Sequence, residues 1–118
     1  MSKVQSFKDL IIWQKSHQLT LKMYKLTKRF PDEEKFGVAS QIRRAVYSIP
    51  SNIVEGHSRN SGKGFKYFLS VAKGSLSELE YFLILSRDLE YITEEEFKEF
   101  EPRVIEISKI LYSFTNNL

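Results

Sequence analysis

The chain has 118 residues, of which 42% are hydrophobic and 28% are charged, and its formal net charge at pH 7 is +3. This length and composition predict one globular domain with a full hydrophobic core. The absence of cysteine excludes disulfides, thiolate metal sites and thiol nucleophiles. No apolar run approaches the roughly 20 residues that cross a bilayer, and the amino terminus lacks the pattern of a signal peptide. We therefore expect a cytoplasmic protein that does not enter a membrane.

The first predicted helix spans residues 9–29. Its hydrophobic seam recurs every three or four residues, which is the period of one helix face. Proline at position 31 is expected to end it, because proline lacks an amide hydrogen and disfavours a helical residue before it. The seam consists of Ile12, Ser16, Leu19, Met23, Leu26 and Phe30.

The second predicted helix spans residues 34–56, and its apolar surface is unusually wide. Tyr47 and Val54 extend the apolar surface beyond the main stripe, so we expect both an internal core and a second subunit. Pro50 is expected to kink this helix without ending it, since the apolar stripe stays in register past it. That stripe consists of Val38, Ile42, Val46, Ile49 and Ile53.

The third predicted helix spans residues 62–90 and follows a turn rich in glycine and serine, with Ser61 as its candidate cap. Gly74 lies inside it, where glycine costs about 1 kcal/mol relative to alanine. Close approach of another backbone explains such a glycine, and simple tolerance is the alternative. Residues 81–85 are apolar all round, so part of this segment is expected to face a partner. The core seam consists of Phe65, Phe68, Ala72, Leu76, Leu79, Leu83 and Ser86.

The fourth predicted helix spans residues 93–115. Thr93 followed three residues later by Glu96 is a capping box, in which each side chain bonds the backbone of the other residue. The short loops between four long amphipathic segments predict an all-α, antiparallel up-down-up-down four-helix bundle that forms one domain, residues 1–118. The seam of this last helix consists of Phe97, Phe100, Val104, Ile107, Leu111 and Phe114.

Several ordered motifs resemble a bacterial family of small four-helix-bundle proteins encoded by intervening sequences in 23S ribosomal RNA genes. The resemblance covers nearly the whole chain, although Val54 stands where the family usually has alanine. Its most specific parts are QIRRA at 41–45, SIPSNI at 48–53, EG at 55–56, GSL at 74–76 and ELE at 78–80. Further matches are Phe7, Leu10, Trp13, Tyr24, Phe30-Pro31, Glu34, Phe36-Gly37 and Phe68-Leu69.

The family resemblance implies assembly as a ring-shaped homopentamer. It also implies a distant relationship to the accessory protein of diversity-generating retroelements, a basic pentamer that binds a reverse transcriptase and nucleic acid. It implies no enzymatic activity, because none is established for the family.

Catalytic and metal-binding patterns are not found in the sequence. His17 and His57 are the only histidines, and neither has the spacing of a metal ligand pair. Ser48 and Ser51 have no neighbouring base, and the glycines at 56–64 do not form a phosphate-binding loop pattern. A protonated His57 can meet a phosphate, whereas a solvated loop histidine is the simpler interpretation. We expect no enzyme activity, no cofactor and no metal.

Charge is segregated along the chain. Residues 35–75 carry seven Lys/Arg against Glu55 alone, whereas residues 76–106 carry three against ten Asp/Glu. This layout suits a polyanion, self-association of opposite patches, or mutual neutralisation of neighbouring helices. Arginines on a packed helix need acceptors, which predicts a network within or between subunits; the alternative is that both arginines face a polyanion. The network would comprise Arg43, Arg44, Asn52, Glu55, Glu78 and Glu80.

A nucleic-acid site is predicted at Arg59, Lys63, Lys66 and Lys73, three of which recur along the third helix. Tyr67 lies among them and can stack on a base or pack in an interface. We therefore expect a non-catalytic oligomer that binds RNA or DNA as an accessory protein. A solvated helix surface is the alternative for the lysines. The alternative for the protein is a structural adaptor ring that docks a protein partner through the acidic region of the fourth helix.

Overall fold

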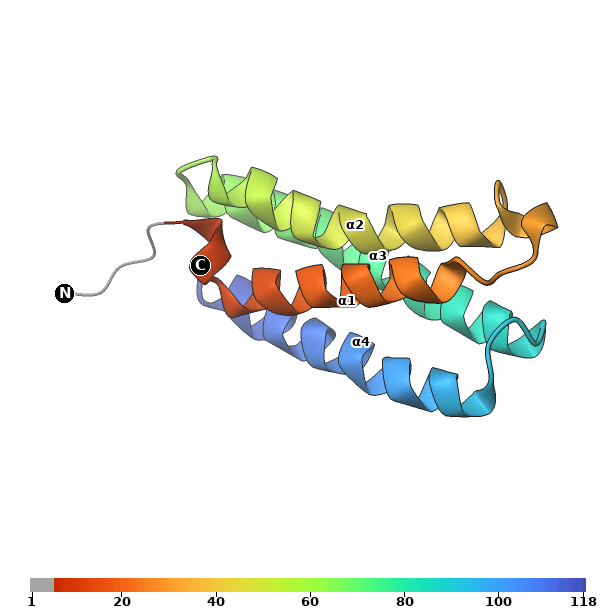
Figure 1. Cartoon of the computed structure of the whole chain (residues 1–118). Coiled ribbons are helices and arrows are strands. Elements are labelled where there is room, and N and C mark those ends of the chain that lie inside the picture. The colour runs from red at the N-terminus through yellow and green to blue at the C-terminus, as the bar shows by residue number, and fades with distance from the viewer. Residues whose placement is uncertain (1–5) are drawn as a thin grey trace.

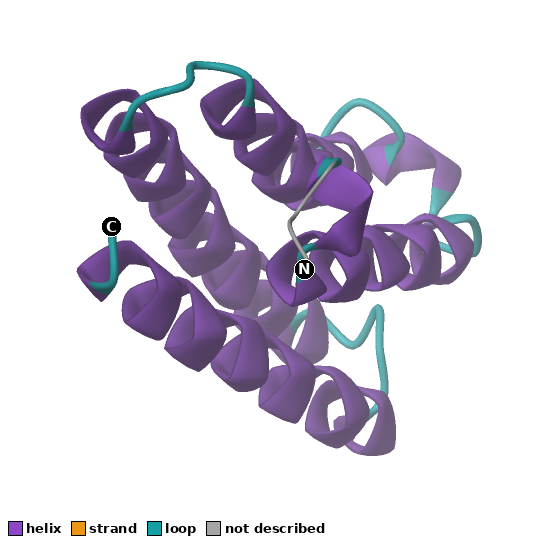
Figure 2. Cartoon of the chain, turned by 90° about the vertical axis from the view of Figure 1, so that its left-hand side faces the viewer, coloured by secondary structure: helices purple, strands orange, loops and turns teal. Residues whose placement is uncertain are grey.

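The computed structural model describes residues 6–118, which form four long helices and no strand (Figures 1 and 2). Each helix packs against the next, and α4 returns to α1 to close the bundle. The predicted antiparallel four-helix bundle is confirmed. The helices are α1 (Ile11–Thr27), α2 (Val38–His57), α3 (Gly62–Asp88) and α4 (Glu94–Asn116), with two short 3₁₀ helices, η1 (Phe7–Asp9) and η2 (Asp32–Glu34).

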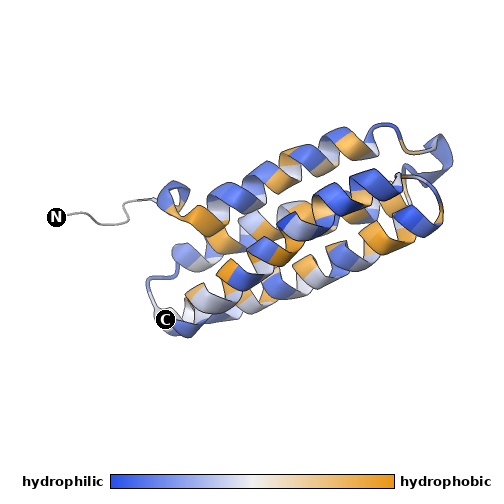
Figure 3. Ribbon diagram, turned by 90° about the horizontal axis from the view of Figure 1, so that it is seen from below, coloured by the Kyte–Doolittle hydropathy of each residue, from blue (hydrophilic) through white to orange (hydrophobic). Residues whose placement is uncertain are grey.

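The core lies along the bundle axis, where the hydrophobic seams of the four helices meet. All six residues of the predicted α1 seam are buried, and the α2 stripe from Ile42 to Ile53 is fully enclosed. Every helix carries hydrophobic and hydrophilic residues on different sides (Figure 3). Within residues 6–118, no helix has a stretch that is both long and apolar enough to cross a membrane.

Two helices begin later than predicted because other local structure precedes them. Ser6 caps the 3₁₀ turn η1, and Leu10 is extended, so α1 begins at Ile11. Gly37 has the non-helical dihedral angles φ −109° and ψ −118°, so the helical conformation is interrupted between η2 and α2. The α2 start is capped from outside the helix, since Glu34 Oε1 accepts from the Val38 amide at 3.1 Å.

Glu34 also joins the start of α2 to the turn between α3 and α4. Its Oε2 accepts from the Tyr91 hydroxyl at 2.6 Å. The Tyr91 hydroxyl and the Val38 amide both stabilise the carboxylate and lower the pKa of Glu34. The same contact raises the pKa of Tyr91, because ionised tyrosine would face a carboxylate. At this turn α3 ends at Asp88, since Glu90 adopts a left-handed conformation with φ 64°.

Pro50 lies inside α2, buried in the core, and leaves one backbone carbonyl without its usual helical donor. The residue four positions earlier is Val46, whose carbonyl would otherwise accept from the amide at position 50. Thr20 of α1 supplies a partial substitute, because its single hydroxyl hydrogen is shared between the Ser16 carbonyl at 2.8 Å and the Val46 carbonyl at 3.2 Å. This contact fixes α1 and α2 in one register.

We expect Thr20→Val to lower the free energy of unfolding by about 1 kcal/mol, because it keeps the side-chain shape and leaves the buried Val46 carbonyl without a donor. Urea denaturation measures the change. The control is the same substitution in a Pro50→Ala background, where the new amide serves Val46 and the cost of Thr20→Val is smaller. An equal cost in both backgrounds would contradict this role for Thr20.

The end of α2 lies unusually close to α3. A Cβ atom added at Gly56 would lie 2.8 Å from Phe65 Cδ1, closer than real Cβ contacts, and 3.0 Å from Phe68 Cβ, tighter than most of them. A side chain at position 56 would therefore force Phe65 to shift or the two helices to separate. Gly74, in the middle of α3, differs because a Cβ added there meets no atom of the chain within 4 Å.

Candidate functional site

Three of the four predicted nucleic-acid-binding residues are exposed lysines on the first half of α3. Lys63, Lys66 and Lys73 form no ion pair among the described residues. Lys66 and Lys73 are seven residues apart, so they lie two turns apart on the same side of α3. Their charges are therefore available to an anion in solution.

The fourth predicted residue, Arg59, lies in the turn between α2 and α3 and already has partners. Its Nη2 lies 2.6 Å from Glu55 Oε2, and its guanidinium carbon lies 4.7 Å from the centre of the Phe68 ring. Both side chains of the ion pair are about half exposed. The charge of Arg59 is thus partly neutralised by Glu55, whereas the three lysines have no such partner in the described part of the chain.

A groove runs between α3 and α4 beside these lysines. Its larger cavity has a volume of about 510 Å³ and a floor that includes the buried Leu69 and Leu111. A second cavity of about 310 Å³ adjoins it, because Lys73, Ser108 and Lys109 line both. We call the two cavities together the α3–α4 groove.

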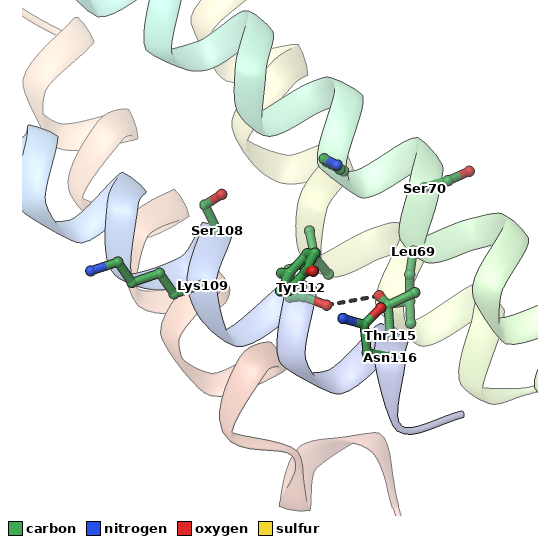
Figure 4. Close-up of a pocket in the computed structure, with 9 residues that line it drawn as sticks. Leu69, Ser70, Ser108, Lys109, Tyr112, Thr115 and Asn116 are labelled. Atoms are coloured by element: carbon green, nitrogen blue, oxygen red, sulfur yellow. Dashed lines mark hydrogen bonds between the residues drawn. The ribbon is translucent and has the colours of Figure 1, made fainter.

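Figure 4 shows Lys109 and Tyr112 of α4 on the side of the groove opposite α3. Tyr112 is 66% exposed. The sequence prediction missed both residues. Antiparallel pairing of α3 with α4 was the available signal, since it brings Lys109 to the level of Lys73, and residues 107–118 contain no carboxylate side chain.

A second exposed surface follows the outer side of α3. Its residues are spaced alternately by four and three positions, so they lie on one face of the helix. Tyr67 and Tyr81 are more than half exposed, and Val71 is also exposed. The neighbouring side of α2 lies beside it, because Ser75 donates to Ser48 at 2.8 Å between the helices. This outer α3 face comprises Tyr67, Val71, Gly74, Glu78 and Tyr81.

Residues 8–113 match the family model of the 23S rRNA-intervening sequence proteins. The chain belongs to this family. A solved structure of a protein of unknown function from the S23 ribosomal protein family of Bacteroides thetaiotaomicron VPI-5482 is similar, with 32% identity and a TM-score of 0.83. The alignment covers 90% of this chain and 96% of that chain. No curated protein gives a significant match.

The segment QIRRA at 41–45 places Arg43 against α1 and not against the acidic residues of α3. Arg43 Nε donates to Thr27 Oγ1 at 2.8 Å and Nη2 donates to the Tyr24 carbonyl at 3.2 Å. Its guanidinium carbon also lies 4.7 Å from the centre of the Tyr24 ring. These contacts engage Arg43 at the carboxyl end of α1 and join α1 to α2 in this chain.

The segment SIPSNI at 48–53 joins α2 to α3. Asn52 Nδ2 donates to the Ser48 carbonyl at 2.7 Å and lies 2.9 Å from Ser48 Oγ, which in turn accepts from Ser75 of α3. The segment therefore places an interhelical hydrogen bond through Ser48 close to Pro50, whose missing amide leaves the Val46 carbonyl to Thr20 of α1.

The six residues of the predicted assembly network thus lie in separate groups within one chain. Arg43 bonds α1, Asn52 bonds Ser48, and Glu55 pairs with Arg59. Arg44, Glu78 and Glu80 are exposed and form no ion pair within residues 6–118. Arg44 and Glu78 line the same shallow cavity of about 320 Å³ between α2 and α3. Their pairing between subunits stays a prediction.

The histidines of this family member lie apart and pack on aromatic rings. His17 stacks on Trp13 with the ring centres 4.9 Å apart, and His57 meets the edge of Phe65 at 6.1 Å. Among the described residues, no group of three histidine or acidic side chains is placed to hold a metal ion.

The opposite end of the bundle is acidic. Glu96 forms the capping box with Thr93 and an ion pair with Arg29. The Arg29 contact is the main cause of the lowered pKa of Glu96. Glu90, Glu94 and Glu95 are exposed nearby, so the two ends of the bundle differ in charge.

Proposed function

We propose that this member of the 23S rRNA-intervening sequence protein family is a non-catalytic, self-associating protein that binds nucleic acid, and RNA in particular. The observation that carries the proposal is the unpaired lysine surface on α3. Lys63, Lys66 and Lys73 lie on a helix segment without carboxylates, and Lys109 adds a fourth charge from α4. Such lysines contact phosphates without reading sequence.

Self-association is the second part of the proposal. The outer α3 face exposes Tyr67, Val71 and Tyr81, and Gly74 leaves open space for the backbone of a neighbouring subunit. Arg44 and Glu78 beside it are complementary charges for contacts between subunits. The family resemblance suggests a homopentamer, in which repetition of a weak phosphate contact raises the total affinity. The relationship to retroelement accessory proteins stays a prediction from the same resemblance.

The absence of a catalytic role is part of the proposal as well. Ser48 and Ser51 have no base beside them, and Ser48 is engaged with Asn52 and Ser75. The two histidines pack on aromatic rings on different helices. Within residues 6–118, neither Ser48 nor Ser51 forms a hydrogen bond with a histidine or carboxylate side chain that could activate its hydroxyl.

The test is the binding of a structured RNA measured by fluorescence anisotropy over a range of salt concentrations. Binding is expected to weaken steeply between about 50 and 200 mM salt, because each phosphate contact releases counterions. The double substitution Lys63→Glu and Lys66→Glu is expected to weaken binding at least tenfold. Its matched control, Lys22→Glu with Lys25→Glu on α1, changes the net charge equally and is expected to retain most of the affinity. Binding insensitive to salt and to Lys63 and Lys66 would refute the proposal.

The acidic start of α4 supports an adaptor as the second candidate function. Glu94, Glu95 and Glu99 are exposed there, and a basic protein surface is a suitable partner. Nucleic acid that copurifies with the protein, detected as a high ratio of absorbance at 260 nm to that at 280 nm, favours the first function. A protein free of nucleic acid that captures a basic partner favours the second.

A further inference from the structure

We propose that the α3–α4 groove is a binding site for single-stranded nucleic acid, whose phosphates contact Lys73 and Lys109 while one base stacks on Tyr112. This proposal rests on the proposed function and assigns it a site. It differs from the sequence prediction, which placed binding on the exposed lysines of α3 alone.

The shape of the groove suits an unpaired base. The two cavities of about 510 and 310 Å³ adjoin, and together they follow α3 from Leu69 to Glu80, a length of about 16 Å at the usual helix rise. Buried leucines form part of the floor, and an apolar floor accepts the face of a base. A duplex keeps its base faces stacked inside, so only a single strand can use this floor.

The charge of the groove suits the phosphates of the same strand. Lys73 and Lys109 lie where the two cavities meet, one on each helix, and neither forms an ion pair among the described residues. Lys66 continues this line two turns before Lys73. Glu80 lines the far end of the groove, two turns after Lys73, so a strand is attracted to one end only.

Tyr112 provides the stacking surface. It is 66% exposed, lines the larger cavity and pairs with no other described aromatic ring. Figure 4 shows it between Lys109 and Thr115 on the α4 side. A ring already packed in the core would be unavailable, whereas this one is free to stack on any base without sequence preference.

The remaining polar groups divide into engaged and free ones. The hydroxyls of Ser70 and Thr115 donate to carbonyls of their own helices, at 2.7 Å in each case. Ser108 and Asn116 have no internal side-chain hydrogen bond within the described part of the chain. These two are therefore the side chains available to the polar edge of a base stacked on Tyr112.

A fluorescent single-stranded RNA of about 12 nucleotides, within the site size of single-strand binders, and a duplex of the same length are the probes for anisotropy. Tyr112→Leu is expected to weaken single-strand binding about tenfold, while Tyr112→Phe, which keeps the ring, binds as the wild type does. Lys73→Gln with Lys109→Gln is expected to make the plot of log affinity against log salt concentration less steep for the single strand. The change in slope should correspond to the loss of about two phosphate contacts. Lys22→Gln with Lys25→Gln is the charge-matched control.

The outcomes separate this proposal from the one on which it rests. If the wild type binds neither probe, the proposed function fails and this site fails with it. If the wild type binds RNA but the groove variants behave as their controls do, the proposed function stands and the groove is excluded as the site. If Tyr112→Leu changes the mass of the assembly and leaves binding intact, the groove is an interface between copies and the proposal is overturned.

Discussion

The double substitution Val71→Arg and Tyr81→Arg is expected to dissociate the proposed assembly completely into chains of 13.9 kDa. Both side chains are exposed in the single chain and lie on one face of α3. Arginine at these exposed positions should change the stability of the folded chain little. Two unpaired charges per subunit buried in an interface would strongly disfavour association. Light scattering coupled to size exclusion measures the mass, and circular dichroism verifies that the helices persist.

Leu21→Arg on α1 is the control for this prediction, because Leu21 is exposed to a similar degree but lies on another helix. It is expected to leave the mass of the assembly unchanged. A wild-type protein that is monomeric at all concentrations would refute self-association itself. An assembly that survives both arginines on α3 would show that subunits meet elsewhere.

The second effect is expected at Gly56, where alanine should lower the free energy of unfolding by about 1 kcal/mol. Alanine gains about 1 kcal/mol in helix propensity, but its Cβ would lie 2.8 Å from the Phe65 ring and 3.0 Å from Phe68 Cβ. Phe65 cannot withdraw freely, because its ring packs against Phe114 at 5.3 Å. Overpacking of this kind costs typically 1–3 kcal/mol and exceeds the gain when the neighbours are held.

Gly74→Ala is the matched control for Gly56→Ala, with both made in the dissociated Val71→Arg, Tyr81→Arg background. A Cβ at position 74 meets no atom of the chain within 4 Å, so alanine there should raise the free energy of unfolding by about 1 kcal/mol. Urea denaturation compares the two. Equal effects of the two alanines would contradict the close approach of α2 to α3 at Gly56.

The fold could be predicted because the hydrophobic period persists over whole helices. The α1 seam from Ile12 to Phe30 is buried throughout, and the caps at Ser61 and Thr93 form as predicted. Helix starts were less predictable, because the cap of α2 is the side chain of Glu34 in a preceding 3₁₀ turn. Nothing in the local sequence reveals that Glu34 also bonds Tyr91, which is 57 residues away.

The candidate site was only partly predictable, because one helix face can meet either of two neighbours. Periodicity places Arg43 on a mixed face of α2 but does not say that the Thr27 hydroxyl of α1 accepts a hydrogen bond from its guanidinium. The exposed lysines of α3 could be read from the sequence. Antiparallel pairing brings Lys109 to the level of Lys73, but the packing of α3 against α4 was needed to place Lys109 and Tyr112 in one groove with Lys73.

The opposite charges of the two ends have a consequence for how the molecule approaches a partner. The dipoles of four antiparallel helices cancel in pairs, so the side chains set the net dipole moment along the 48 Å axis. Its positive end lies at the turn between α2 and α3, and its negative end lies at the turn between α3 and α4 (Figure 1). The field of a polyanion therefore exerts a torque that turns the lysine end forward before contact. In a ring of parallel subunits these moments add, which would give the ring one rim that attracts nucleic acid and one that repels it.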